Sequence, residues 1–202
     1  MPAGLMASAP PDQIPARADF RRMQRERVER IRGLMREQGL DALVLLGNTN
    51  VVYATGAIWP LADSGRANFE QPVAVVAADD EWPHLFSPMR EEDRPQVALA
   101  PDHLHGPVYL DFDEGVELFA SQLTGLVPDK AVIAIDEWTN ALRRERSILF
   151  APDTPLDGGR IISAAKAVKT PDELSCMREG LRITESGIAA VQALLEIGRA
   201  HV

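Results

Sequence analysis

The chain has 202 residues, with 21 basic and 30 acidic side chains and a net charge of −9. This balance argues against a nucleic-acid backbone as the main partner, because phosphate binding requires a basic surface. The only cysteine, Cys176, rules out an intrachain disulfide and an all-cysteine metal site, and it is expected to be an inert helix residue. No apolar run approaches the ~18 residues of a membrane span, so a cytoplasmic protein without a membrane partner is expected.

The N-terminal region predicts a leader followed by a helix. Residues 1–18 are rich in Pro, Ala and Ser, which is typical of a flexible leader. Asp19 is a good N-cap for a helix that runs to about Gln38 and is closed by Gly39. One helix face is mostly apolar, while the other carries interleaved Arg and Glu. A solvated, ion-paired face explains these charges better than nucleic-acid binding does.

The middle of the chain alternates between strand-like and helix-like patterns. DALVLLG (41–47) predicts a strand buried on both faces, and the stretch 72–88 predicts two strands around the acidic turn Asp79–Glu81. Further strands are predicted at GPVYLDF (106–112), KAVIAIDE (130–137) and GRIIS (159–163), and helices at 113–126, capped by Asp113, and at 138–152. The predicted fold class is α/β, with a mixed, largely parallel sheet and helices on both faces.

The C-terminal region predicts one long helix. Thr170 is a suitable N-cap, Pro171 suits the first helical position, and Glu173 completes a capping box. The helix should run from 171 to at least 195 and carries an apolar stripe. Because the α/β layer is already complete, we expect this helix to open a second domain.

Two groups of side chains could carry chemistry. His103 and His105 form an H-x-H pair beside Asp102, which could hold a metal, but no further cluster at a recognisable spacing completes a site. A polar loop is the better interpretation, and no metal ligand is assigned. A carboxylate group precedes the predicted helix at 113, where capping explains it better than catalysis; its members are Asp111, Asp113 and Glu114.

The predicted loop from Asn48 to Gln71 is the best candidate for a binding site. Such long loops are commonly functional, and this one starts at the carboxyl end of a strand, where ligands gather in open α/β sheets. A guanidinium for carboxylate binding and three aromatic rings lie in it: Arg66, Tyr53, Trp59 and Phe69. Alternatively, the aromatic rings cover the edge of the sheet. Both interpretations stay open.

Two stretches together resemble the N-terminal part of the creatinase, prolidase and aminopeptidase P family, the pita-bread metalloenzymes. The first is GLDALVLLGNTNVVYATG (39–56), and the second is AKAVKTPDELSCMREGLRITESGI (165–188). The second corresponds to the boundary segment K-[ST]-P-x-E-[IL] followed by M-R and a long helix. The resemblance covers about residues 19–195.

The resemblance implies the N-terminal, dimerisation and substrate-site-capping domain of a Xaa-Pro dipeptidase- or aminopeptidase-like metallohydrolase. Such proteins bind two divalent metal ions in a following catalytic domain, for which this chain supplies no ligand. In the homodimer the loop reaches the neighbouring subunit's site, where the substrate-contacting candidates are Arg66, Trp59, Phe69 and Tyr53. The substrate would be a peptide or a small carboxylate. Creatinase-like and lyase relatives remain alternatives, as does a stand-alone small-carboxylate-binding or interaction module.

The expected organisation has four parts. Residues 1–18 form the leader, 19–165 the creatinase-like α/β domain, and 166–196 a linker with the first helix of a catalytic domain. The ending EIGRAHV (196–202) breaks the helix pattern at Gly198. We therefore expect 197–202 to be a non-native tail and the chain alone to be inactive.

Overall fold

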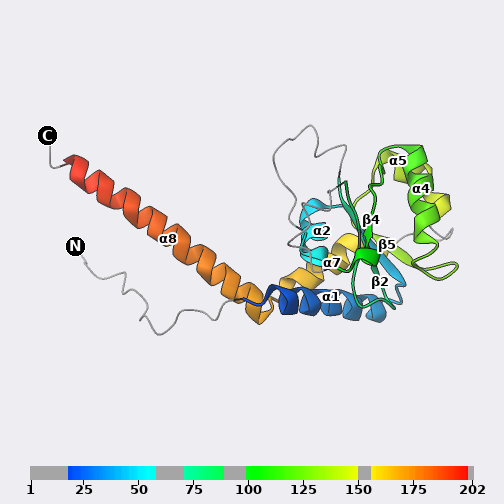
Figure 1. Cartoon of the computed structure of the whole chain (residues 1–202), viewed down its shortest axis with the longest axis horizontal. Helices are drawn as coiled ribbons and strands as arrows, with labels where there is room; N and C mark the ends of the chain where they lie inside the picture. The colour runs from blue at the N-terminus through cyan, green and yellow to red at the C-terminus, as the bar shows by residue number, and fades with distance from the viewer. Residues whose placement is uncertain (1–17, 58–70, 89–98, 150–155, 200–202) are drawn as a thin grey trace. The chain divides into compact units, whose positions relative to one another are not determined.

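The computed structural model describes residues 18–57, 71–88, 99–149 and 156–199 (Figure 1). The chain forms two compact units, of which the larger is Gln24–Val168 and the smaller comprises Met1–Met23 and Lys169–Val202. The predicted residues Trp59, Arg66 and Phe69 lie outside the described part, as do the leader through residue 17 and residues 200–202. In the part of the chain that is described, no helix has the length and apolar character of a membrane span.

A six-stranded mixed sheet forms the centre of the larger unit, with the order β4-β3-β2-β1-β5-β6. β2 is antiparallel to both of its neighbours, whereas the other three neighbouring pairs are parallel. This arrangement confirms the mixed, largely parallel sheet. The strands are β1 (Ala42–Leu45), β2 (Val73–Ala77), β3 (His84–Phe86), β4 (Leu104–His105), β5 (Ile133–Ile135) and β6 (Leu156–Asp157).

Alternate residues of the buried strands pack into two separate hydrophobic cores, one on each face of the sheet. In β1, Leu43 and Leu45 pack with helices α1 (Phe20–Glu37), α2 (Asn48–Thr55) and α7 (Gly158–Ala167). On the opposite face, Val44 packs with α4 (Asp113–Leu123), α5 (Asn140–Arg144) and α6 (Arg146–Leu149). Figure 1 shows these two helical layers on either side of the strands. The prediction of helices on both faces is confirmed.

The end signals predicted for the first helix are also confirmed. The Asp19 carboxylate accepts a hydrogen bond from the Arg22 amide at 3.0 Å, as an N-cap does. At the other end, Gly39 adopts a φ of 65°, the left-handed conformation that glycine favours after a helix. The helix therefore lies between the two residues that the sequence indicated.

Two predicted strands are wrong. Residues 159–163 belong to α7, because the Asp157 carboxylate caps a helix there by accepting a hydrogen bond from the Arg160 amide at 3.3 Å. Residues 106–112 form no strand, because the chain turns at Tyr109, whose carbonyl accepts from the Phe112 amide at 3.1 Å. This turn leads directly into α4.

Three other expectations need correction. The predicted loop at 48–71 begins as helix α2, and the helix predicted at 138–152 is divided into α5 and α6 within its described residues. Asp113 does not cap α4; Phe112 holds the N-cap position without a side-chain hydrogen bond. Instead, the Asp113 carboxylate pairs with Arg144 at 2.6 Å, which joins α4 to α5.

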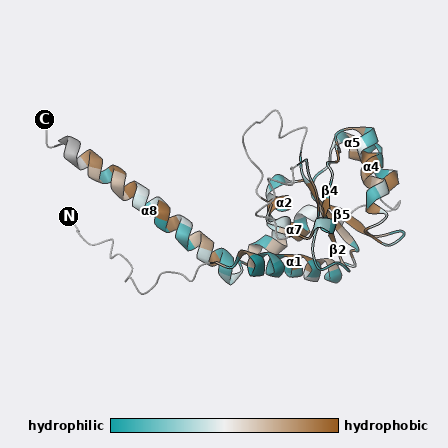
Figure 2. Ribbon diagram, in the orientation of Figure 1, coloured by the Kyte–Doolittle hydropathy of each residue, from teal (hydrophilic) through white to brown (hydrophobic). Residues whose placement is uncertain are grey.

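The smaller unit contains α8 (Pro171–Arg199) and the predicted capping box. The Thr170 hydroxyl accepts from the Glu173 amide at 3.1 Å, and the Glu173 carboxylate accepts from the Thr170 amide at 2.7 Å. Further along α8, every residue from Gly180 to Leu195 is exposed. Hydrophobic and hydrophilic residues alternate along this helix (Figure 2).

Asp172 is the best-anchored carboxylate of the smaller unit. Its two oxygens accept hydrogen bonds from Nε and Nη2 of Arg22, each at 2.8 Å, and one of them also accepts from the Asp19 amide at 3.0 Å. The Arg22 hydrogen bonds, together with the Asp19 amide, hold the pKa of Asp172 below its ordinary value. The ionised carboxylate is therefore the form that the fold favours.

Replacing Arg22 by glutamine is expected to raise the pKa of Asp172 toward its ordinary value. Since the folded-state pKa is depressed, the pair stabilises the fold above the unfolded pKa of about 3.9 and loses this effect as the pH falls through the folded pKa. NMR titration of the Asp172 carboxyl carbon measures the shift directly. Arg25→Gln, an exposed change on the same helix, is the control, and an unchanged Asp172 titration in Arg22→Gln would contradict the assignment.

Candidate functional site

The first polar site lies at the carboxyl ends of the parallel strands β1 and β5. Asp136 follows β5, and its carboxylate accepts hydrogen bonds from the backbone amides of Leu46 at 2.7 Å and Gly47 at 3.1 Å. It also accepts from Nδ2 of Asn50 at 2.7 Å. One carboxylate thus joins the end of β5 to the end of β1 and to the first turn of α2. We name Asp136, Gly47 and Asn50 the strand-end network.

Three side chains of this region end close to Gly47, so a side chain at this position would displace them. A Cβ atom at Gly47 would lie 2.6 Å from Oε1 of Glu137, 2.8 Å from Nδ2 of Asn50 and 3.0 Å from Oδ2 of Asp136. Burial, and then the charge of Asp136, raise the pKa of Glu137 above its ordinary value. Two carboxyl groups and an amide therefore converge around one glycine.

Helix α2 is also held in place by polar contacts with α7 and α1. Oδ1 of the Asn50 side chain accepts a hydrogen bond from the Lys166 ammonium group of α7. The Tyr53 hydroxyl donates to the Ala165 carbonyl at 3.0 Å, and the Arg27 guanidinium lies 4.7 Å from the centre of the Tyr53 ring. These contacts join α2 to both α1 and α7.

Gly56 ends α2 in the left-handed conformation, with a φ of 72°. Its amide donates to the Val52 carbonyl at 2.9 Å, and the Gln24 side chain donates to the carbonyls of Tyr53, at 3.2 Å, and Ala54. The terminal carbonyls of the helix are thereby satisfied by α1. The stretch GNTNVVYATG is an anchored helix with a glycine at each end.

Of the four predicted substrate-contacting residues, the structure describes only Tyr53. This residue is 7% exposed, and its hydroxyl donates a hydrogen bond to the Ala165 carbonyl. Its observed role is to hold α2 against α7, and substrate contact by Tyr53 stays a prediction. The described chain resumes at Gln71, whose side-chain amide donates to the Leu46 carbonyl at 2.5 Å. Gln71, the first described residue after Trp59, Arg66 and Phe69 in the sequence, thus lies beside the strand-end network.

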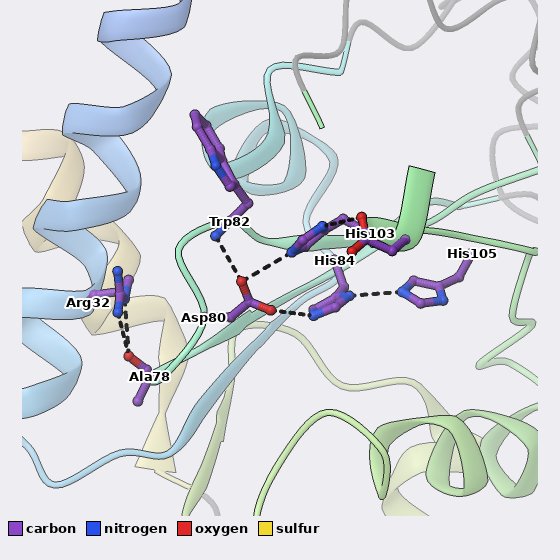
Figure 3. Close-up of polar contacts among 8 residues, drawn as sticks. Arg32, Ala78, Asp80, Trp82, His84, His103 and His105 are labelled. Carbon is purple, nitrogen blue, oxygen red and sulfur yellow. Dashed lines mark hydrogen bonds and ion pairs between the residues drawn. The ribbon is translucent and has the colours of Figure 1, made fainter. Parts of the chain in front are cut away.

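A second polar cluster lies at the opposite end of the strands, around the turn between β2 and β3. Oδ1 of Asp80 lies 3.1 Å from Nε2 of His103, and Oδ2 lies 3.1 Å from Nε2 of His84. Nδ1 of His84 lies 2.9 Å from Nε2 of His105, and Nδ1 of His103 lies 3.1 Å from Oδ1 of Asp102. Figure 3 shows Asp80 on one side of the two imidazole rings, bonded to both, with His105 beyond His84 on the other side. We name Asp80, His84, His103, His105 and Asp102 the histidine cluster.

The turn and the strands fix the positions of these side chains. Nε and Nη2 of Arg32 in α1 donate to the Ala78 carbonyl at 3.1 and 2.9 Å, which holds the start of the turn (Figure 3). Oδ1 of Asp80 also accepts from the Trp82 amide at 3.2 Å. Parallel pairing of β3 with β4 then brings the residues of 101–105 beside His84. The rings of His84 and His103 stack with their centres 4.6 Å apart.

The histidines differ in how readily they take up a proton. Burial, and then the nearby His103, lower the pKa of His84, and burial together with His84 lowers the pKa of His105. Burial also disfavours the charged form of His103, but hydrogen bonds to Asp80 and Asp102 outweigh it and raise the His103 pKa. Burial alone would raise the pKa of Asp80, yet the hydrogen bonds from His103 and a backbone amide hold it below its ordinary value. His103 is therefore the first of the three to become cationic.

The H-x-H spacing indicated only part of this cluster. His103 and His105 do not act as a pair: His103 contacts Asp80 and Asp102, whereas His105 contacts His84. Asp80 and His84 were not singled out, because the turn and the parallel β3–β4 pairing that bring them to His103 leave no fixed spacing in the sequence. Of the carboxylate group predicted at the start of α4, Asp113 pairs with Arg144.

The chain matches the model of a known family, and its fold is similar to those of solved structures over much of its length. Residues 27–150 match the family model of the Creatinase/Prolidase N-terminal domain. The prolidase from Pyrococcus horikoshii OT3 is similar at 17% identity with a TM-score of 0.56, covering 82% of this chain and 42% of that chain. The Xaa-Pro dipeptidase from Bacillus anthracis is similar at 14% identity with a TM-score of 0.60, covering 85% of this chain and 43% of that chain. The chain thus spans less than half the length of either protein, and no curated protein matches it.

Proposed function

Since the chain belongs to the creatinase/prolidase N-terminal domain family, we propose that it is the N-terminal domain of a Xaa-Pro dipeptidase- or aminopeptidase-like metallohydrolase. The observation that carries the proposal is the family match over residues 27–150, on a fold shared with a prolidase and a Xaa-Pro dipeptidase. Both of those proteins are more than twice as long as the part that this chain covers. The divalent metal ions of such an enzyme would bind in its other part, and no residue of this chain is assigned to them.

In this proposal the domain covers the substrate site of the partner subunit in a homodimer. The segment 58–70 would supply the contacts, because it rejoins the sheet at Gln71, beside the carboxyl ends of β1 and β5. The Arg66 guanidinium would bind a substrate carboxylate through two parallel hydrogen bonds, and Trp59 and Phe69 would pack on its apolar part. The strand-end network would hold the base of this segment. We place the enzyme in the cytoplasm, consistent with the single cysteine.

The first test uses the native coding sequence and its protein product. We expect the native coding sequence to replace the tail at 197–202 and to continue past residue 196 with a set of Asp, His and Glu metal ligands. We expect the longer protein to cleave Xaa-Pro dipeptides when supplied with Mn²⁺ or Co²⁺. The 202-residue chain alone should show no cleavage. A continuation without such ligands, or cleavage by the short chain alone, would refute the proposal.

In the longer protein, Arg66→Ala is expected to raise KM for a Xaa-Pro dipeptide about 10- to 100-fold, with a smaller change in kcat. The reason is the loss of a charged hydrogen bond that holds the bound substrate, an interaction worth about 1.5–3 kcal/mol. Steady-state kinetics on purified dimer measures the effect, with Arg66→Lys intermediate because lysine cannot bind both oxygens in a fixed plane. Arg25→Ala, at an exposed position of α1, is the matched control. Equal KM values for Arg66→Ala and the control would remove Arg66 from the substrate site.

A further inference from the structure

The histidine cluster contains the donor set of a transition-metal site. One carboxylate oxygen of Asp80, one ring nitrogen of His84 and one ring nitrogen of His103 all lie within 4.8 Å of one another. Each imidazole Nε2 lies 3.1 Å from an Asp80 oxygen. Ligand atoms bound to one tetrahedral zinc ion at about 2.0–2.1 Å are about 3.3 Å apart, so the two Asp80–imidazole distances already match and any wider pair must close by at most about 1.5 Å. The donors are two imidazoles and one carboxylate, a combination that suits zinc and neighbouring divalent metals.

The surrounding hydrogen bonds are those that metal-bound histidines use. A metal-binding imidazole typically donates its other ring N–H to a carboxylate or another acceptor, which fixes the ring. Nδ1 of His103 lies 3.1 Å from Oδ1 of Asp102, so a carboxylate orients this ring. Nδ1 of His84 lies 2.9 Å from Nε2 of His105, so an imidazole orients the other ring. Both candidate ligand rings therefore have a partner on the side away from Asp80.

Without an ion, the same atoms form a proton-sharing network. A carboxylate can only accept, so His84 donates from Nε2 to Asp80 and, when neutral, accepts at Nδ1 from His105. With an ion at Nε2, His84 would carry its proton on Nδ1 and donate to Nε2 of His105. The direction of one hydrogen bond reverses, while the rings need not rotate. The network is thus compatible with both states of the site.

The cluster is partly enclosed and still reachable. The side chains of His84 and His103 are 7% and 12% exposed, whereas that of Asp80 is 34% exposed. An ion would enter from the Asp80 side and keep a position there for water. We propose that Asp80, His84 and His103 bind one Zn²⁺ ion, with Asp102 and His105 orienting the two imidazoles. The ion would join the β2–β3 turn to the segment 101–105 at the edge of the sheet, independently of the function proposed above.

The test measures metal binding by the purified 202-residue chain after treatment with a chelator. Isothermal titration with ZnCl₂ is expected to saturate at one equivalent. Titration with Co²⁺ should give visible ligand-field bands of a four- or five-coordinate site, without the thiolate charge-transfer band that Cys176 would cause. Absence of both signals in the unaltered chain would overturn the proposal without any variant being made.

Variants then assign the ligands. His103→Gln and Asp80→Asn are expected to weaken Zn²⁺ binding at least about 100-fold, and Asp102→Asn about 10-fold, as loss of an orienting group does. Cys176→Ser should bind as the unaltered chain does, and so should His201→Gln, which changes the one histidine outside the described residues. Circular dichroism confirms that each variant is folded. Unchanged Zn²⁺ binding by folded His103→Gln, or its loss in His201→Gln, would place the ion elsewhere.

Discussion

Gly115→Ala is expected to lower the free energy of unfolding of the larger unit by about 3 kcal/mol or more, the upper range of overpacking costs. Gly115 is buried in the first turns of α4, where the chain turns back on itself after Tyr109. A Cβ atom at Gly115 would overlap the Tyr109 carbonyl oxygen and lie 2.6 Å from its carbonyl carbon. Since the obstacle is backbone and not a flexible side chain, α4 must shift away from the turn or the turn must open.

Chemical denaturation followed by circular dichroism measures this loss, and Gly33→Ala is the matched control. Gly33 also lies inside a helix, and its Cβ atom would meet only Nη2 of Arg36, at 3.9 Å. Alanine is a better helix former than glycine by about 1 kcal/mol, so the control should be neutral or stabilising. Opposite signs for the same substitution in two helices are the expected result. A Gly115→Ala chain as stable as Gly33→Ala would show that α4 does not approach Tyr109 so closely.

Asp136→Ala is expected to destabilise the larger unit by about 3 kcal/mol. The substitution leaves the amides of Leu46 and Gly47 and the side chain of Asn50 without their shared acceptor, and each unsatisfied buried group costs about 1–3 kcal/mol. Because these groups hold the first turn of α2, we also expect the substitution to accelerate amide exchange more in α2 than in β2. If the α2 amides exchange equally fast in Asp136→Ala and in the unaltered chain, the helix does not depend on Asp136.

Two further variants separate the effect of losing the hydrogen bonds of Asp136 from the effect of losing a negative charge. Asp136→Asn keeps one acceptor oxygen and should lose about half as much stability, since its NH₂ group faces donors. Asp129→Ala removes a carboxylate from an exposed position before β5 and should change stability by no more than about 0.5 kcal/mol. In the longer protein of the proposed function, Asp136→Ala should also raise KM, because the base of the segment 58–70 is loosened.

Local sequence patterns were sufficient for the buried strands and insufficient where tertiary contacts decide the structure. β1, β2 and β5 are continuous apolar runs bounded by turn residues, and all three were predicted. Helix α2 was missed because NTNVVYAT has Asn and β-branched residues, poor helix formers, and no helical apolar stripe. Its helical form depends on Asn50 and Tyr53, which bind partners far away in the sequence, Asp136 and Ala165. Such contacts cannot be derived from local patterns.

At the short apolar run 159–163, by contrast, a local signal for the helix was present in the sequence. Ile161 and Ile162 suit either a strand or a buried helix, and length alone does not separate the two. The deciding signal was Asp157, the N-cap residue directly before α7. The strand interpretation did not use it. For the histidine cluster no local signal existed, because β4, which brings His103 and His105 to His84, has only two residues.

The two outer strands of the sheet limit how copies of this chain can associate. Within the described residues, β4 and β6 each have two residues, so each edge offers few free backbone groups. A strand added from another chain requires a longer row of donors and acceptors for stable pairing. A continuous sheet shared between subunits is therefore disfavoured at both edges. If copies of this domain associate, we expect side chains of helices and loops to form most of the interface, so that substitutions there can change its geometry while the sheet stays intact.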